Sequence, residues 1–149
     1  MNKNIFERSN KLIRACSAAY IGVIDENGFP SVSTIMPINT ENIFETFFAT
    51  GLESNKAKRL QQNNQASVCF HVGGNNITLV GTAEILTDQA IKSKCWQSEG
   101  FIEHFPGGET DPNYCIIKIT TNRVSLWVDN EDAQFTIDEL LAAQSRCCT

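Results

Sequence analysis

Residues 50–60 read TGLESNKAKRL, a run that takes the chain from a β-strand into a helix. Gly51 relaxes the turn after the strand, and Ser54 is a good helix N-cap because its side-chain oxygen accepts an unpaired backbone N–H. The run therefore predicts a strand over 43–50, with aromatic residues on both faces, and a helix over 54–63.

The start of this expected helix is also a candidate anion site. Backbone N–H groups point outward at a helix N-terminus, and phosphate is their common guest. The hydroxyl of Ser54 and the ammonium of Lys56 add hydrogen bonds and positive charge there. A capped surface helix with a solvated Lys/Arg face gives the same pattern, so the residues alone leave both interpretations open.

Apolar spacing and turn signals define the other elements outward from this run. Apolar residues at three- and four-residue spacing predict an amphipathic helix over 3–16. Alternation predicts a strand over 31–36, and Asn27-Gly28 before it is a hairpin-turn signal. Further helices are expected over 88–96 and 136–143, and further strands over 19–25, 66–72, 76–86, 114–120 and 124–128.

The number and spacing of the expected strands bound the fold class. About seven short strands, many joined by tight turns, favour an antiparallel barrel or sandwich over a parallel βαβ sheet. The chain has 149 residues, and it shows no internal repeat and no clean linker. We therefore expect a single domain over residues 1–149.

Charge and composition exclude several classes of protein. The formal net charge of −5 argues against broad nucleic-acid binding, which needs a basic surface. No apolar run approaches the roughly 20 residues of a membrane span. The polar start of the chain lacks the apolar core of a secretory signal. We therefore expect a cytoplasmic protein with neither a membrane nor a nucleic acid as partner.

The six cysteines predict no disulfide framework and no metal site, since none of them forms a CxxC pair. Cys69 and Cys115 lie in apolar, strand-like runs and are expected to be buried and inert. Cys147 and Cys148 end the sequence, and no function is assigned to them.

Motifs for catalysis are scarce. His71 and His104 have no metal-ligand spacing, and His71 is expected to pack on its strand. The sequence has no nucleophile elbow, no Walker A motif, no HExxH and no Rossmann fingerprint. Trp96 is expected to pack on the apolar face of its helix. Trp127, at the end of an expected strand, either fills the core or covers a flat aromatic ligand.

The order of these segments resembles the pyridoxamine 5'-phosphate oxidase-like flavoproteins, and within them the small general-stress-protein type. The resemblance covers residues 5 to 128, and its motifs are Gly28-Phe29-Pro30, Ser54-x-Lys56, Val80–Ile85, Phe105-Pro106-Gly107-Gly108 and Asp111-Pro112. It implies a mainly β protein, a split β-barrel of about seven mostly antiparallel strands with a few short helices. It also implies a homodimer that holds FMN in a groove between its two subunits.

The resemblance implies a set of cofactor-binding residues as well. Carried over by position, they are Ser33, Thr34, Ile35, Met36, Thr50, Ser54, Asn55, Lys56, Asn76 and Trp127. Residues 33–36 would line the flavin ring largely through backbone groups, and Thr50 would close the end of its strand near the flavin. Residues 54–56 would hold the phosphate. Asn76 matches a flavin-contacting position, and Trp127 would reach the ring from the partner subunit.

The implied function is that of an FMN-dependent oxidoreductase acting on a small-molecule substrate or electron donor. The flavin would take a hydride at N5 and pass electrons to oxygen or another acceptor, so the cofactor itself would perform the chemistry. The vitamin-processing oxidase has basic residues at the positions of Ser33 and Ile38, so vitamin B6 oxidation itself is not expected. The alternatives are a non-catalytic flavin carrier or redox sensor, a related barrel that binds deazaflavin or haem, and a barrel with an empty groove.

Overall fold

The computed structural model describes residues 3–38 and 40–146. Its helices are α1 (Lys3–Ala15), α2 (Asn55–Gln62), α3 (Gln89–Cys95), α4 (Ser98–His104) and α5 (Ile137–Arg146), with a 3₁₀ turn, η1, at Gly108–Thr110. Its strands are β1 (Ala19–Ile24), β2 (Pro30–Ile38), β3 (Glu45–Gly51), β4 (Gln65–Val72), β5 (Asn75–Leu86), β6 (Tyr114–Val128) and β7 (Glu131–Thr136).

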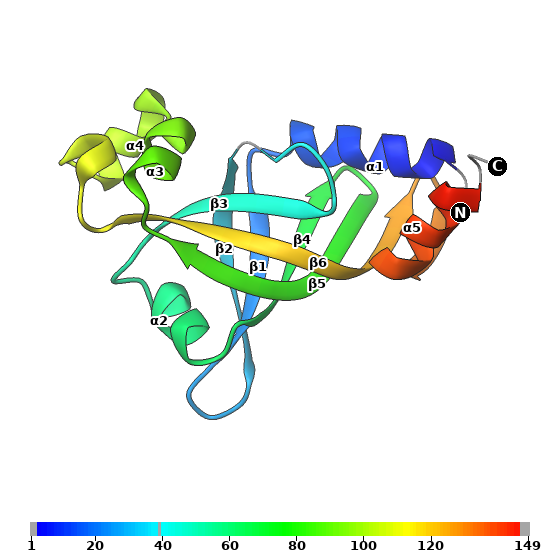
Figure 1. The fold of residues 1–149 in the computed structure, drawn as a ribbon, viewed down its shortest axis with the longest axis horizontal. Helices are drawn as coiled ribbons and strands as arrows, with labels where there is room; N and C mark the ends of the chain where they lie inside the picture. Colours follow the sequence, from blue (N-terminus) through cyan, green and yellow to red (C-terminus); the bar gives the residue numbers. More distant parts are fainter. Residues whose placement is uncertain (1–2, 39, 147–149) are drawn as a thin grey trace.

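Six of these strands close into a barrel. They are hydrogen-bonded in the order β3-β2-β1-β4-β5-β6, and β6 returns to pair with β3. Every pairing is antiparallel, and β7 extends the sheet beyond β6. Figure 1 shows α3 and α4 at one end of the barrel and α5 at the other. The predicted mainly β barrel with a few helices is confirmed.

Alternation along the strands fills the barrel with apolar side chains. Ile21, Phe48, Phe70, Ile77 and Leu79 are all fully buried in this core. The expected amphipathic helix, α1, buries its apolar stripe against the same cluster. A second cluster lies where α3 and α4 cover the barrel end, and Trp96 packs there edge-on against neighbouring aromatic rings, as predicted.

Two features of β6 and β7 differ from the sequence prediction. The expected strands 114–120 and 124–128 form one continuous strand. Its pairing register with β5 shifts between Val80 and Gly81, opposite the polar stretch 121–123, so the strand continues through a β-bulge there. Strand β7 was not expected, since none of its residues is fully buried. Its turn carries the missed signal: Asp129 and Asn130 both have positive φ, 52° and 63°, as a type I′ hairpin requires.

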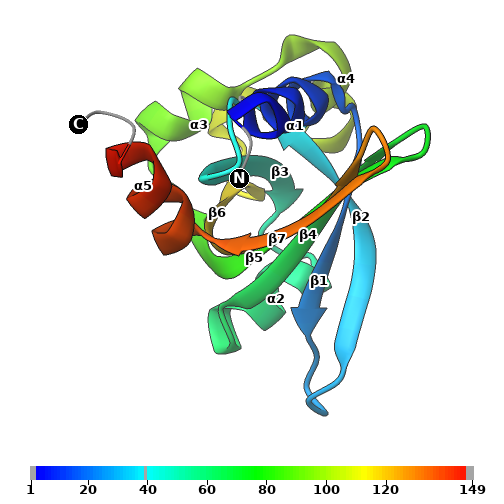
Figure 2. The same cartoon turned by 90° about the vertical axis from the view of Figure 1, so that its right-hand side faces the viewer.

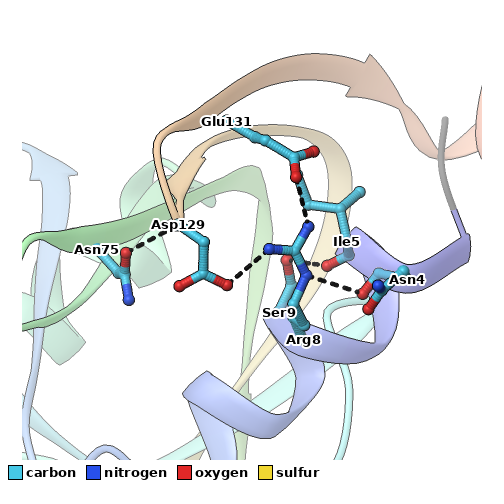
Figure 3. A network of polar contacts seen from close by, with 7 residues as sticks. All are labelled: Asn4, Ile5, Arg8, Ser9, Asn75, Asp129 and Glu131. Carbon is cyan, nitrogen blue, oxygen red and sulfur yellow. Dashed lines mark hydrogen bonds and ion pairs between the residues drawn. The ribbon is translucent and has the colours of Figure 1, made fainter.

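A polar network ties α1 to this β6–β7 turn (Figure 3). The Arg8 guanidinium donates to the carboxylates of Asp129 and Glu131, at 2.6 and 2.9 Å. The Asp129 N–H donates in turn to the side-chain oxygen of Asn75, at 3.0 Å. The network therefore fixes the turn that follows Trp127, although its carboxylates are half exposed and solvent screens them.

Candidate functional site

Five of the predicted cofactor-binding residues line one pocket of about 510 Å³. Thr34, Ile35 and Met36 come from β2, Thr50 from the end of β3, and Lys56 from the first turn of α2. The volume lies within the range of small-molecule sites. The opposite wall was not predicted, and it consists of Phe101, His104, Phe105 and Asn113.

Ser54 caps α2 as the sequence predicts. Its backbone is extended, and its hydroxyl accepts the N–H of Ala57 at 3.2 Å. The Thr50 hydroxyl lies 3.4 Å from the Ser54 hydroxyl, which links the end of β3 to the start of the helix. The cap satisfies one of the orphan donors of this helix N-terminus.

The next two backbone donors remain available. No described residue accepts the N–H of Asn55 or Lys56, whereas the Lys58 N–H already bonds to the Ser54 carbonyl at 3.1 Å. The Asn55 side chain is exposed. Two unpaired N–H groups at a helix start favour an anion through both hydrogen bonding and the helix dipole.

The Lys56 ammonium adds charge to the same place. Its side chain is partly buried in the pocket wall, and this desolvation lowers its pKa below the ordinary value for lysine. Among the residues that the structure describes, no carboxylate pairs with it. An unpaired, partly desolvated cation in the same helical turn as free N–H groups fits a phosphate. Of the predicted phosphate residues, Lys56 lines the pocket, whereas Ser54 and Asn55 do not.

The second basic residue nearby is already engaged. The guanidinium of Arg59 donates to both carboxylate oxygens of Glu26, at 3.0 and 3.3 Å, and to the hydroxyl of Ser31 at 3.2 Å. It therefore ties α2 to the β1–β2 hairpin, which projects past the rest of the sheet in Figure 2. Lys56 carries the positive charge of the pocket.

One edge of β2 has free backbone groups. Strand β3 pairs with β2 only at residues 36–38, whereas β1 pairs with it over residues 30–35. Within residues 3–38 and 40–146, no other strand covers the free edge of 30–35. Unpaired N–H and C=O groups are therefore open to a ligand near Thr34 and Ile35. Ser33 is exposed and does not line the pocket.

Asn76 and Trp127 lie together, away from this pocket. They are register partners on β5 and β6, and Trp127 lies beyond residues 114–120, the stretch of β6 that pairs with β3 beside the pocket. The outer barrel wall between the two groups is left uncovered by the residues that the structure describes. It exposes Tyr20 (48%), Val32 (67%) and Trp127 (41%). Because Trp127 is exposed, it does not fill the core. The other interpretation, that it covers a flat ligand, stays open.

The cysteines and histidines that the sequence singled out follow the predictions only in part. Cys115 is buried, and desolvation raises its pKa to about 11, so its thiol stays protonated and inert. Cys69 is only partly buried, and His71 is exposed rather than packed, since its strand position faces the open wall. Cys147 and Cys148 lie outside the described residues. His104 lines the pocket beside the ring of Phe105.

A larger hollow of about 680 Å³ lies on the outside of the barrel and contains none of the predicted residues. Its Glu45 and Lys118 form an ion pair at 3.3 Å, and Glu41 and Lys94 also line it. We assign the candidate site to the smaller pocket because five of the predicted residues meet there. No group of three potential metal ligands occurs in the part of the chain that the structure describes. None of the described helices is long and apolar enough to cross a membrane.

Comparisons with known proteins agree with this architecture. A family model described as pyridoxamine 5'-phosphate oxidase like matches residues 6–145. A Clostridium acetobutylicum protein related to general stress protein 26 of B. subtilis, of the pyridoxinephosphate oxidase family, is 26% identical. Its TM-score is 0.84, with 94% of this chain and 99% of that chain covered. General stress protein 26 from Bacillus anthracis is 22% identical, with a TM-score of 0.74 and coverage of 89% and 99%.

A heme-binding protein from Mycobacterium smegmatis has the same fold at 12% identity, with a TM-score of 0.73 and coverage of 95% of this chain and 62% of that chain. No curated protein matches the chain in sequence. The match of the family model over nearly all of the chain, and the shared barrel, show that this protein belongs to the pyridoxamine 5'-phosphate oxidase-like family.

Proposed function

We propose that the protein binds FMN in the pocket between β2, β3 and α2 and acts as a flavin-dependent oxidoreductase. One observation carries the proposal: the free N–H groups of Asn55 and Lys56 and the unpaired ammonium of Lys56, a residue that lines the pocket, all belong to the first turn of α2. A phosphate monoester offers acceptor oxygens and negative charge suited to all three groups.

The remaining pocket residues suit a flat, polar-edged ring. The free backbone edge near Thr34 and Ile35 offers donors and acceptors to the edge of such a ring. Met36 and Phe105 contribute apolar surface. When bound, a flavin supplies hydride and electron chemistry, and the protein's part is to orient it and keep one face accessible.

The proposal includes a homodimer. Asn76 and Trp127 lie too far along their strands to serve the pocket within one chain, since Trp127 is twelve residues beyond Cys115, the register partner of Thr50, and a strand rises about 3.4 Å per residue. A second copy seated on the uncovered wall would bury Tyr20, Val32 and Trp127 and bring the partner subunit's Trp127 toward the flavin. Each FMN would then lie between two subunits, and a small electron donor would reach its open side.

Titration of the purified protein with FMN, followed by absorption spectroscopy, tests the binding. A perturbed flavin spectrum with saturable uptake is expected, and no uptake would refute the proposal. Anaerobic addition of a reduced nicotinamide, then oxygen, separates the oxidoreductase from a carrier or sensor. Repeated reduction and reoxidation of the bound flavin is expected, and a flavin that binds without being turned over would favour the carrier.

Haem is the second candidate ligand. One observation favours it: His71 is exposed on the uncovered wall and could ligate iron there. The structural relative from Mycobacterium smegmatis is a heme-binding protein. Addition of haem to wild-type protein and to a His71→Ala variant tests this candidate. A His71-dependent shift of the haem absorption band would favour haem over FMN.

A further inference from the structure

The segment Phe105–Asn113 carries two of the sequence motifs, and the proposed function does not account for most of it. Its loop is folded around Asp111, whose carboxylate accepts the N–H groups of Gly107 and Asn113, both at 2.9 Å. These two bonds lower the pKa of Asp111 below its ordinary value. A Cβ at Gly107 would lie 3.1 Å from Asp111 atoms, so only glycine fits without a shift. The loop therefore has one defined shape.

The end of this loop holds the turn between β3 and α2. The Asn113 carbonyl accepts the N–H of Leu52 at 2.6 Å, and its side-chain oxygen accepts the N–H of Glu53 at 2.9 Å. The Asn113 amide nitrogen lies 3.0 Å from the place where a Cβ on Gly51 would stand. Asn113 thus accepts hydrogen bonds from two consecutive residues, Leu52 and Glu53, which lead directly into Ser54 and the free donors of α2.

A buried lysine holds the loop from its other side. Lys92 of α3 is only 5% exposed, and its ammonium donates to the Asp111 carbonyl at 2.9 Å. The ammonium also lies 5.4 Å from the centre of the Tyr114 ring, and the Tyr114 hydroxyl donates to the Lys92 carbonyl at 3.0 Å. Because such a charge is costly to bury without partners, these contacts fix α3 against the loop.

We propose that Asn113 is a positioning residue for the phosphate end of the cofactor site, and that it acts by fixing the turn before α2. The proposal rests on the proposed FMN function. Asn113 accepts hydrogen bonds from the N–H groups of Leu52 and Glu53. The N–H groups of Asn55 and Lys56 are then the pair available to the ligand. Lys92 and Asp111 act one step further away, by holding the loop that carries Asn113.

The test compares FMN with riboflavin, which has the same ring and no phosphate. In Asn113→Ala the backbone bond to Leu52 remains and the side-chain bond to Glu53 is lost. We expect FMN affinity to fall about 3- to 10-fold, the effect of one hydrogen bond, with riboflavin affinity unchanged. Amide hydrogen exchange at Glu53 should become faster. Asn64→Ala, at an exposed asparagine beyond the far end of α2, is the matched control and should bind both ligands like wild type.

The outcomes separate this proposal from the function on which it rests. Wild-type protein that binds FMN, with Asn113→Ala binding it equally well, overturns the positioning role alone. Equal weakening of FMN and riboflavin also overturns it, because Asn113 would then act on the ring. Wild-type protein that binds no FMN overturns the proposed function, and the positioning role with it. Lys92→Met should weaken FMN less than Asn113→Ala does, again without affecting riboflavin.

Discussion

Replacement of Lys56 by methionine removes the charge at the start of α2 and keeps an unbranched side chain of similar length. The lysine side chain is partly buried in the pocket wall, and no described carboxylate pairs with it. The substitution should therefore leave the fold intact, because a methionine can fill the same space and no ion pair is broken. Binding of the phosphate should suffer specifically.

The magnitude follows from the geometry. A hydrogen bond to a charged group is worth about 1.5 to 3 kcal/mol, and the lower part of this range applies because Lys56 is only partly buried. A loss of about 1.5 to 2 kcal/mol corresponds to about 10- to 30-fold weaker FMN binding. Lys56→Glu should bind FMN still more weakly, because it adds repulsion. Since burial lowers the pKa of Lys56, wild-type affinity should also fall as the pH rises through that pKa and the ammonium loses its proton.

Quenching of flavin fluorescence on titration measures the affinity of each protein for FMN and for riboflavin. Lys58→Met is the matched control on the same helix, since Lys58 faces solvent and pairs with Glu53 at 3.3 Å. It should bind FMN like wild type, and riboflavin should bind wild type, Lys56→Met and Lys58→Met equally. Wild-type FMN affinity in Lys56→Met, or equal losses for FMN and riboflavin, would refute the assignment of the phosphate to α2.

Three further predictions concern other parts of the molecule. Trp127→Ala should weaken self-association and FMN binding together, which sedimentation and titration measure; a change in only one of them would count against the shared groove. The thiol of Cys115 should stay unreactive toward a thiol reagent until the protein unfolds, because burial raises its pKa to about 11; labelling of the native protein at Cys115 would contradict this. Gly81→Ala should lower the free energy of unfolding by about 3 kcal/mol in urea, because its Cβ would collide with the Thr120 carbonyl. Gly74→Ala, where a Cβ meets nothing, should change the free energy of unfolding little. Equal effects of the two substitutions would contradict the close approach of Gly81 to Thr120.

The sequence predicted most of the barrel because its strands alternate and its turns carry clear signals. Ser54 caps a helix as expected, since the side-chain bond to the Ala57 N–H is local and needs no tertiary context. The continuity of β6 could not be predicted from its own sequence. It depends on the register shift at Gly81 of β5, which lies about 40 residues earlier in the chain. Strand β7 has a largely exposed surface and therefore lacks the apolar alternation on which such predictions depend.

The candidate site was predictable on one side only. The positions on β2 and β3 were named from the resemblance alone, those on α2 also from the helix-start motif, and five of these residues meet in one pocket. The wall that includes Phe101 and Asn113 comes from a segment after β5, and the local sequence gives no sign of which pocket it borders. Helix α4 was missed because Gly100, at φ 84°, breaks it into short turns without a helical repeat. The bonds from Asn113 to Leu52 and Glu53 join residues about 60 positions apart, so only the fold reveals them.

Sedimentation velocity of the FMN-loaded protein, followed at a wavelength that only flavin absorbs, tests the central claim most directly. The account predicts that flavin sediments with a species of twice the 16.5 kDa chain mass, at one flavin per chain. Flavin that remains unsedimented, or that travels with a single chain, would contradict a flavin site shared between two subunits.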